Sequence, residues 1–404
     1  MKRTAIIGGG AAGFFAAISA KHHHPDAEVI LFEKSPSLLS KVKISGGGRC
    51  NVTHNCFKIS ELVKYYPRGE KSLKKVFGYF SPTDTIQWFR ERGVETKTES
   101  DGRMFPVTDD SQTIIDALTR EANKLGVKIR TRQPVQKIIP QSGNGFELSL
   151  KKGQQEFFDK VIVATGGSPR SSGFNWLREL GHSIAEPVPS LFTFNMPDET
   201  IKELMGVVAD PVSLKIMGSR LRSEGPLLIT HWGMSGPAVL KLSAFGAREL
   251  AEKNYDFKVL VNWTGNTSEQ EIRQILKEAE DQNPKKKIAN VNPFGLPGRL
   301  WEFLVEKLDL PEDMIWMNMG KKNINRLLHL LTNDEYQVRG KTTFKEEFVT
   351  CGGVELSEVD FKTMESRVVP GLYFAGEVLD VDGVTGGFNF QAAWSTGYVA
   401  GKLA

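Results

Sequence analysis

Short, mainly apolar runs recur along the chain and predict buried strands. They cover residues 4–7, 28–33, 160–164 and 372–375. Continuous apolar character is typical of strands that helices cover on both faces of a parallel sheet. Residues 110–126 instead place apolar side chains at helical spacing and end at a glycine, which predicts an amphipathic helix. The pattern therefore predicts an α/β fold with a doubly wound, Rossmann-like sheet.

The middle of the chain has a different pattern. From about Leu191, short strand-like runs such as 212–216 and 257–261 surround turn-rich sequence and predict a β-rich region. The following residues become helical, and Ser268 and Glu271 have the spacing of a capping box. Apolar strands return only near the C-terminus, so the sheet domain is discontinuous. We predict three parts: residues 1–190 with 351–404 as the sheet domain, 191–265 with 337–350 as a β-rich insert, and 266–336 as a small helical subdomain.

Composition excludes several classes of protein. The 404 residues are 40% hydrophobic and 25% charged, as in ordinary globular domains, and their three cysteines cannot form an even set of disulfides. No apolar run reaches the length of a membrane span, and glycines interrupt the N-terminal apolar segment, so we expect a cytoplasmic protein without a signal peptide. The net charge of +4 favours anionic ligands but is far from the basic stripe of a typical nucleic-acid binder.

Two short basic runs have simple interpretations. His22 to His24 close the first predicted helix, where the helix dipole favours cations, so we interpret them as a solvated helix end and predict no metal site. Lys285 to Lys287 follow Pro284 and are interpreted as a solvated connection.

The glycine-rich turn after the first strand carries the clearest chemistry. Gly8, Gly10 and Gly13 form the pattern G-x-G-x-x-G between the strand and an Ala-rich helix. The three glycines allow a tight turn, a close approach of the backbone to a pyrophosphate, and close packing of the helix on the sheet. Glu33 lies twenty positions beyond Gly13, where an acid accepts hydrogen bonds from a ribose. These residues predict a dinucleotide site; a βαβ unit without a ligand is the alternative.

The C-terminal segment indicates which dinucleotide is bound. A flavin needs a polar group along its ribityl chain and a helix N-terminus near its pyrimidine ring, where negative charge gathers on reduction. Asp380 and the turn Gly386-Gly387, which opens a predicted helix, supply both. Thr165 and Gly166 end another buried strand, where a cofactor passes over the sheet. We therefore predict FAD, with ordinary glycine-rich turns as the alternative at both places.

The motifs Ser45–Asn51, Gly376–Asp380 and Thr385–Gln391 resemble those of the BaiN-like flavoproteins, a family that includes aminoacetone oxidase and a proposed bile-acid ring reductase. The resemblance covers essentially the whole chain, including residues 102–106, 230–237 and 351–354. It implies an FAD-binding domain with a β-rich and a helical insert. With the residues above, it implies a cofactor site made of Gly8, Gly10, Ala11, Ala12, Gly13, Glu33, Lys34, Lys41, Gly47, Gly48, Arg49, Cys50, Asn51, Val135, Thr165, Gly166, Gly376, Glu377, Asp380, Gly386, Gly387, Phe388 and Asn389.

Two residues are candidates for a catalytic role. Five residues separate Cys50 from a second cysteine, Cys56, whereas redox pairs of this kind usually have four intervening residues, so we expect a packed or flavin-contacting thiol. His231 could protonate a substrate after hydride transfer, since a histidine titrates near neutral pH; a structural histidine is the alternative.

We predict an FAD-dependent oxidoreductase that acts on a small organic substrate by hydride transfer at flavin N5, with NAD(P)H docking transiently. No second G-x-G-x-x-G is present in the inserts, so a dedicated nicotinamide domain is not expected. The alternatives are an amine oxidase that passes electrons to oxygen, a flavoprotein that modifies tRNA, and a flavin-binding protein without turnover. We expect no membrane and no stable nucleic-acid partner; the sequence leaves the substrate and the oligomeric state open.

Overall fold

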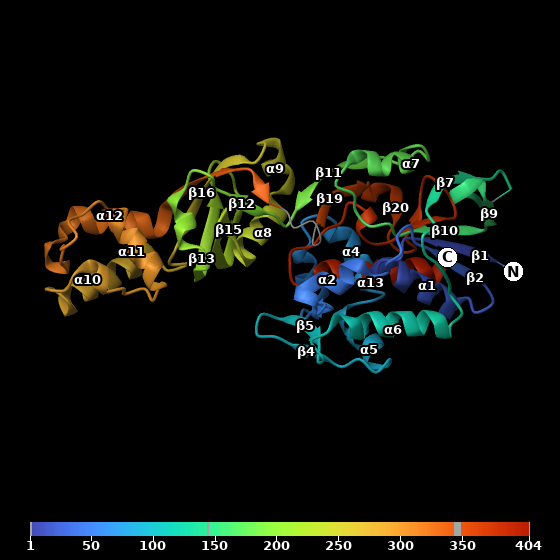
Figure 1. Cartoon of the computed structure of the whole chain (residues 1–404), viewed down its shortest axis with the longest axis horizontal. Coiled ribbons are helices and arrows are strands. Elements are labelled where there is room, and N and C mark those ends of the chain that lie inside the picture. Colours follow the sequence, from blue (N-terminus) through green and yellow to red (C-terminus); the bar gives the residue numbers. More distant parts are fainter. Residues whose placement is uncertain (1, 144, 343–348, 404) are drawn as a thin grey trace. The chain divides into compact units, whose positions relative to one another are not determined.

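A computed structural model describes residues 2–143, 145–342 and 349–403. The chain forms two compact units. Unit 1 comprises Met1–Ser190 and Phe344–Ala404, and unit 2 comprises Leu191–Thr343. Each unit has its own sheet and hydrophobic core, and each is described by itself below (Figure 1).

The central sheet of unit 1 is mainly parallel, as the continuous apolar runs predict. β1 pairs in parallel with β2 on one side and with β10 on the other, and β10 pairs in parallel with β22. The strand order is β20 (Val359–Asp360), β21 (Glu365–Ser366), β22 (Leu372–Phe374), β10 (Lys160–Val163), β1 (Arg3–Ile7), β2 (Glu28–Phe32) and β6 (Lys128–Arg130). The α/β Rossmann-like class predicted from the sequence is confirmed.

Two helices from opposite ends of the chain pack tightly in this unit. They are α1 (Ala11–His23) and α13 (Phe388–Leu403) (Figure 1). Glycines on α13 permit the close approach: a Cβ at Gly397 would lie 2.5 Å from the carbonyl oxygen of Ala12, and one at Gly401 would lie 2.3 Å from that of Ala16. The N-terminal and C-terminal segments are thereby fixed against each other, which positions the site described below.

The predicted amphipathic helix is α6 (Ser111–Lys124), whose N-cap residue Asp110 accepts a hydrogen bond from the backbone N–H of Gln112 at 2.8 Å. The strand-like runs that follow α6 form an antiparallel sheet of β7 (Val135–Pro140), β8 (Phe146–Leu150) and β9 (Gln155–Phe158). The other elements of unit 1 are α2 (Ser40–Gly48), β3 (Thr53–His54), α3 (Ile59–Leu62), α4 (Glu70–Phe77), α5 (Pro82–Arg90), β4 (Thr96–Thr98), β5 (Arg103–Pro106), α7 (Asn175–Arg178), β11 (Ile184–Ser190) and β19 (Val349–Val354).

Unit 2 is built on an antiparallel sheet. Its strand order is β17 (Asp334–Arg339), β16 (Asp256–Asn262), β13 (Val208–Ile216), β14 (Arg222–Thr230), β15 (Gly233–Ser235), β12 (Thr193–Asn195) and β18 (Lys341–Thr342). Two helices, α8 (Pro237–Phe245) and α9 (Ala247–Glu252), follow β15. The turn-rich sequence around residues 230–237 is thus a tight hairpin followed by a helix.

Three further helices of unit 2 lie together beside this sheet (Figure 1). They are α10 (Glu269–Gln282), α11 (Gly298–Glu306) and α12 (Gly320–Asn333). The predicted capping box of Ser268 and Glu271 is present at the start of α10. Buried tryptophans at 263, 301 and 316 join the helices and the sheet in one hydrophobic core. The separation of residues 266–336 as a subdomain of their own stays a prediction.

None of the helices in the described parts of the chain is long and apolar enough to span a membrane.

Candidate functional site

Four of the predicted cofactor residues, namely Gly8, Glu33, Thr165 and Gly376, come just after strands of the parallel sheet of unit 1. Ile7 is in register with Phe32 on one side and with Val163 on the other, and Val163 is in register with Phe374. Four neighbouring parallel strands therefore end at the same edge, which is where open α/β sheets bind ligands. The residues that follow these strand ends are Gly8, Glu33, Ala164 and Ala375.

The glycines of the N-terminal turn fall into two kinds. A Cβ at Gly8 would lie 2.3 Å from the carbonyl oxygen of Ala164, and one at Gly13 would lie 1.9 Å from that of Gly8, so these two glycines are needed for packing inside the protein. A Cβ at Gly10, the N-cap residue of α1, would meet no atom within 4 Å. The backbone of the turn is therefore open at the N-terminus of α1, where helix N–H groups favour an anionic group such as a pyrophosphate.

Glu33 is held at the end of β2 by backbone donors. Its carboxylate accepts hydrogen bonds from the N–H of Gly9 at 2.8 Å and from that of Ser35 at 2.7 Å. These bonds fix the carboxylate beside the glycine turn, and each carboxylate oxygen keeps further capacity to accept. Its predicted role toward a ribose fits this position. Lys34, next in the chain, is exposed.

A second open stretch of backbone lies at the end of α2, where the chain departs from helical geometry. Gly47 and Gly48 have φ angles of +70° and +87°, and a Cβ at either position would meet nothing within 4 Å. Arg49, which follows them, places its guanidinium 4.0 Å from the centre of the Phe105 ring and pairs with Glu99 at 2.6 Å. The turn thus exposes backbone, while the charged side chain of Arg49 is engaged inside the protein.

Asn51 connects this turn to the start of α13. Its amide oxygen accepts a hydrogen bond from the N–H of Gly387 at 3.0 Å, and its amide nitrogen donates to the carbonyl of Thr53 at 3.0 Å. The approach is so close that a Cβ at Gly387 would lie 2.5 Å from that carbonyl oxygen. The turn that contains Asn51 and the glycine turn before α13 are therefore hydrogen-bonded to each other, although they lie far apart in the sequence.

A buried polar network fixes this junction. The side-chain oxygen of Gln391, in the first turn of α13, accepts hydrogen bonds from the hydroxyls of Thr53 at 2.6 Å and Thr85 at 2.9 Å. Trp394 donates from its ring nitrogen to the carbonyl of Val52 at 2.9 Å. Sequence reasoning missed this network, because its members come from three distant segments; only the position of Gln391 just after the glycine turn could have suggested it.

The predicted residues Phe388 and Asn389 make internal contacts. The Phe388 ring stacks on Tyr65 with ring centres 4.4 Å apart and on His54 with centres 4.6 Å apart. The Asn389 amide accepts from the N–H of Gly383 at 2.8 Å and donates to its carbonyl at 2.9 Å. Both side chains hold the segment before α13 in place, so any contact they make with a cofactor comes from the backbone or from their remaining exposed edges.

Lys41 and Glu377 meet beside the end of β10. The carboxylate of Glu377 accepts from Lys41 Nζ at 2.8 Å and from the N–H of Thr350 at 2.8 Å. A Cβ at Gly167 would lie 2.5 Å from Thr350 Oγ1, whereas one at Gly166 would meet nothing within 4 Å. Thr350 Oγ1 is buried and makes no hydrogen bond to the described residues. A buried hydroxyl next to open backbone suits a ligand that carries hydrogen-bonding groups.

The buried acids after Gly376 differ in their partners. Asp380 is 6% exposed, and its N–H donates to the carbonyl of Val354 at 3.0 Å. Asp382 is fully buried, forms an ion pair with Arg68 and accepts from the hydroxyl of Ser190 at 2.6 Å. Burial raises the pKa of Asp382, and the guanidinium of Arg68 opposes this shift. Sequence reasoning singled out Asp380 and missed this pair, although an acid between buried valines was a signal for it.

Cys50 is buried, and burial raises the pKa of its thiol to about 12. The side chain is therefore a neutral thiol at physiological pH, which suits packing better than nucleophilic chemistry. Neither Cys56 nor Cys351 forms a disulfide with a described residue.

His231, the other catalytic candidate, lies in unit 2. It occupies the turn between β14 and β15 and is exposed, with its ring edge-on to Trp232 at 4.4 Å between centres. Trp232 in turn donates from its ring nitrogen to Thr193 Oγ1 at 3.0 Å.

The remaining predicted residues of unit 1 lie at the ends of its elements. Val135 begins β7, Thr165 comes after the end of β10, and Ala11 and Ala12 form the first turn of α1.

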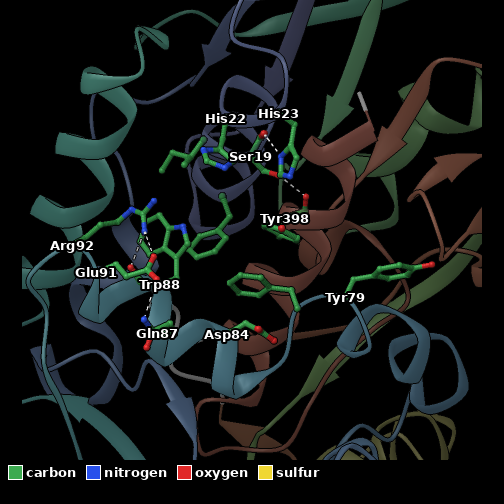
Figure 2. A pocket seen from close by; sticks show the side chains of 13 residues that line it. Ser19, His22, His23, Tyr79, Asp84, Gln87, Trp88, Glu91, Arg92 and Tyr398 are labelled. Atoms are coloured by element: carbon green, nitrogen blue, oxygen red, sulfur yellow. Dashed lines mark hydrogen bonds and ion pairs between the residues drawn. The ribbon is translucent and has the colours of Figure 1, made fainter.

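A cavity of about 250 Å³ lies at the other end of α1 (Figure 2). It is lined by aromatic and polar side chains, among them Ser19, His23, Trp88, Arg92 and Tyr398. The His23 ring bonds through Nδ1 to the carbonyl of Ser19 at 2.9 Å, and burial lowers the pKa of His23. The lining residues on α1 run from Phe15 to His23, so the cavity lies along the C-terminal part of this helix, and no glycine of the N-terminal turn lines it. The described residues contain no group of three or more metal-ligating side chains.

The chain matches a family model described as "HI0933-like protein Rossmann domain" over residues 2–403. Two curated relatives are similar over most of their length. The chain is 30% identical to a 3-dehydro-bile acid delta(4,6)-reductase of Clostridium scindens, covering 100% of this chain and 99% of the relative. It is also 30% identical to a ribosomal RNA dihydrouridine synthase of Escherichia coli, covering 93% of this chain and 91% of the relative.

Solved structures share the fold at low sequence identity. A 3-ketosteroid-delta4-(5alpha)-dehydrogenase of Rhodococcus jostii superimposes with a TM-score of 0.51 at 13% identity, covering 99% of this chain and 97% of that one. A flavocytochrome c3 fumarate reductase gives a TM-score of 0.50 at 18% identity, covering 99% and 77%. At these identities the likeness supports the fold alone.

Proposed function

The chain belongs to the HI0933-like family of Rossmann-domain proteins, and we propose that it is an FAD-dependent reductase of carbon–carbon double bonds conjugated to a carbonyl group. One observation carries this proposal. Two relatives, each 30% identical over more than 90% of the chain, have names that describe different substrates but the same kind of reduction.

The shared chemistry follows from the two names. A 3-dehydro bile acid with double bonds at positions 4 and 6 is an unsaturated ketone. Uridine becomes dihydrouridine when the ring double bond next to a carbonyl is saturated. For uridine, and for the C4–C5 double bond of the bile acid, a hydride adds to the carbon β to the carbonyl and a proton adds to the α carbon. At the C6–C7 double bond the conjugated system places the hydride on the δ carbon instead. Bound FAD, once reduced by two electrons from a donor such as NAD(P)H, would supply the hydride from its N5 atom.

The residues at the sheet edge fit this cofactor. The open backbone at Gly10 and the N-terminus of α1 would bind the pyrophosphate, and Glu33 would bind the adenosine ribose. The open turns at Gly47, Gly48 and Gly166 leave room beside the sheet for the rest of an extended dinucleotide. The N-terminus of α13 would favour negative charge near the flavin pyrimidine ring.

Two further roles are proposed from the sequence. NAD(P)H would be a transient electron donor, because the inserts contain no second glycine-rich nucleotide motif. His231 would donate the proton to the α carbon, a role for which its exposed position on a short turn leaves the ring accessible. Neither of these two relatives is named an amine oxidase.

The experiment that tests the cofactor and its electron donor is an anaerobic titration. Purified protein is reconstituted with FAD and mixed with NADH or NADPH while its absorbance near ~450 nm is recorded. We expect bleaching by at least one of the two nucleotides. Gly10→Val is the matched variant: it fills open space beside the proposed pyrophosphate position and should retain little FAD. Protein that binds no FAD, or bound FAD that neither nucleotide bleaches, would contradict the proposal.

A further inference from the structure

An exposed basic segment of unit 2 is fixed by backbone pairing. Lys285, Lys286 and Lys287 are all exposed. The N–H of Trp316 donates to the carbonyl of Lys286 at 3.1 Å, and that of Met317 donates to the carbonyl of Pro284 at 3.0 Å. The lysine run is therefore an ordered segment paired with residues 314–317. Helix α12 begins shortly after this pairing, at Gly320.

The start of α12 adds two more lysines. Gly320 begins the helix with a φ of +61°, and Lys321 and Lys322 follow it in the first turn. This turn contains no acidic residue, and no side chain caps it. Cations in the first turn of a helix are unfavourable, because the helix dipole already places positive charge there. The local sequence thus concentrates positive charge where helix stability alone would select against it.

We call Lys285, Lys286, Lys287, Lys321 and Lys322 the lysine surface. None of them forms an ion pair within the described chain. Other lysines of this helical region are neutralised: Lys277 pairs with Asp281 at 2.8 Å, and Lys307 pairs with the buried Asp334.

The nearest exposed acids along the paired strand lie at its far end. Glu312 and Asp313 precede Met314, whose carbonyl accepts from the N–H of Ile288 at 3.1 Å. The antiparallel pairing places these two acids beyond Lys287, away from Lys285 and α12. On the other side, Glu280 and Asp281 precede Lys285 at the end of α10, and both contact Lys277.

We propose that the lysine surface binds the phosphate backbone of an RNA substrate. The inference rests on the proposed reductase function and decides between its two substrate classes in favour of a uracil ring in RNA. Five unpaired lysines match a polyanion with regularly spaced charges, whereas a bile acid carries at most one carboxylate. Because lysines bind phosphates as point charges, the contact positions the RNA without reading its sequence.

This proposal replaces two expectations from the sequence, namely a solvated connection at Lys285 to Lys287 and the lack of a stable nucleic-acid partner. In the sequence, Lys321 and Lys322 lie 34 positions or more beyond Lys287. Only the backbone pairing of residues 284–288 with 314–317 brings the two groups to one region.

The test compares two triple variants of the FAD-loaded full chain. Lys285, Lys286 and Lys287 are replaced by Gln in the first. The control replaces Lys71, Lys74 and Lys75, which are three exposed lysines on α4 without ion pairs to described residues. Binding of protein-free ribosomal RNA of Escherichia coli is measured by filter binding at several salt concentrations. We expect the first variant to bind at least about 10-fold more weakly, with a salt slope reduced by about 2 to 3, and the control to stay within about 2-fold of wild type.

Three results would overturn the proposal: no RNA binding by the wild type at low salt, an equal loss in both variants, or binding to phosphatidylserine vesicles without binding to RNA. Reoxidation of the reduced flavin by a small unsaturated ketone is recorded on the same preparations. This second readout does not involve RNA, so a failure of the reductase function is distinguishable from a failure of the lysine surface. Failure of both would remove the substrate assignment as well.

Discussion

The sheet edge of unit 1 and the lysine surface of unit 2 make their proposed contacts in different ways. At the sheet edge, small residues expose backbone, and the neighbouring charged groups of Glu33, Arg49 and Glu377 are already held by internal partners. On the lysine surface the backbone pairs with a neighbouring segment, and the side chains form no ion pair with any residue that the structure describes. The proposed cofactor site thus presents fixed backbone to its ligand, whereas the proposed RNA site presents exposed side-chain charge.

This difference has consequences for mutation. Sites built from closely packed backbone should be intolerant of added atoms, because protein interiors are close-packed. Sites built from exposed charge should tolerate substitution without loss of stability, since surface positions seldom change it by more than about 0.5 kcal/mol. Substitutions at both kinds of site test these expectations, and the largest expected effect comes first.

The buried ion pair of unit 1 should give the largest effect. Replacing Asp382 by Ala leaves the guanidinium of Arg68 without its carboxylate in a buried setting. We expect the free energy of unfolding to fall by about 3 to 5 kcal/mol. Urea denaturation followed by circular dichroism measures this. Replacing both Asp382 and Arg68 by apolar residues should recover part of the loss; a loss below about 1 kcal/mol for the single variant would show that the pair is dispensable.

Substitutions at the two kinds of glycine in the N-terminal turn should affect different properties. Gly13→Ala should lower the stability of the protein, whereas Gly10→Ala should weaken the binding of FAD. Gly13→Ala places a methyl group 1.9 Å from the carbonyl oxygen of Gly8, so we expect a loss of about 1 to 3 kcal/mol or more in the protein without cofactor. Gly10→Ala meets no protein atom, so its stability should stay within about 0.5 kcal/mol.

The affinity for FAD is the second property to be measured. Gly10→Ala should weaken FAD by about 10-fold or more, because its methyl group would occupy the space proposed for the pyrophosphate. Thermal unfolding without FAD and fluorescence titration with FAD measure the two effects. If Gly10→Ala binds FAD as well as wild type, the pyrophosphate does not lie at this turn.

At the amino end of the same sheet, side-chain charge does stabilise unit 1. Glu28 accepts from Arg3 at 2.6 Å and from Lys128 at 2.5 Å, and these hydrogen bonds lower its pKa to about 2. A lowered folded-state pKa contributes stability above the unfolded value near 4.5, and this stability is lost as the pH falls toward 2. After allowance for solvent screening we expect about 1 to 2 kcal/mol.

The pH dependence of Glu28→Gln checks this assignment. The variant should be less stable than wild type at pH 7, and the difference should shrink as the pH falls from about 4.5 to 2. Denaturation series at each pH measure both proteins. A difference that stays constant over this range would mean that ionisation of Glu28 plays no part.

The smallest effect is expected on the lysine surface. Replacing Lys285, Lys286 and Lys287 by Gln should change the free energy of unfolding of the FAD-free protein by less than about 0.5 kcal/mol, since none of the three forms an ion pair with a described residue. Thermal unfolding beside the α4 variant measures this. A loss above 1 kcal/mol would show that these lysines support the fold.

The sequence indicates the sheet and its glycine turn well, because their signals are local. Gly8, Gly10, Gly13 and the apolar strand before them stand within ten positions, and the chemistry of each glycine follows from its immediate neighbours. The continuous apolar runs likewise predict the parallel strands and the α/β class. Only the structure shows which of these glycines face open space and which are packed against other atoms.

The rest of the candidate site depends on distant partners. The contacts of Gln391 with Thr53 and Thr85, and of Asp382 with Arg68, join segments about 300 positions apart that no local pattern connects. The lysine surface depends on backbone pairing within an otherwise irregular segment. Turn motifs and hydrophobic periodicity reflect interactions between residues that are close in sequence. They therefore do not predict contacts between distant segments.

The most direct test of the central claim is the reoxidation of the reduced flavin by substrate. Wild-type protein loaded with FAD is reduced anaerobically and mixed with protein-free ribosomal RNA or with a 3-oxo steroid that carries a conjugated double bond, while absorbance near ~450 nm is followed. Our account predicts that the oxidised flavin spectrum returns with RNA, and that dihydrouridine appears in the RNA after digestion. A flavin that stays reduced with both compounds would contradict the claim that this protein reduces conjugated double bonds.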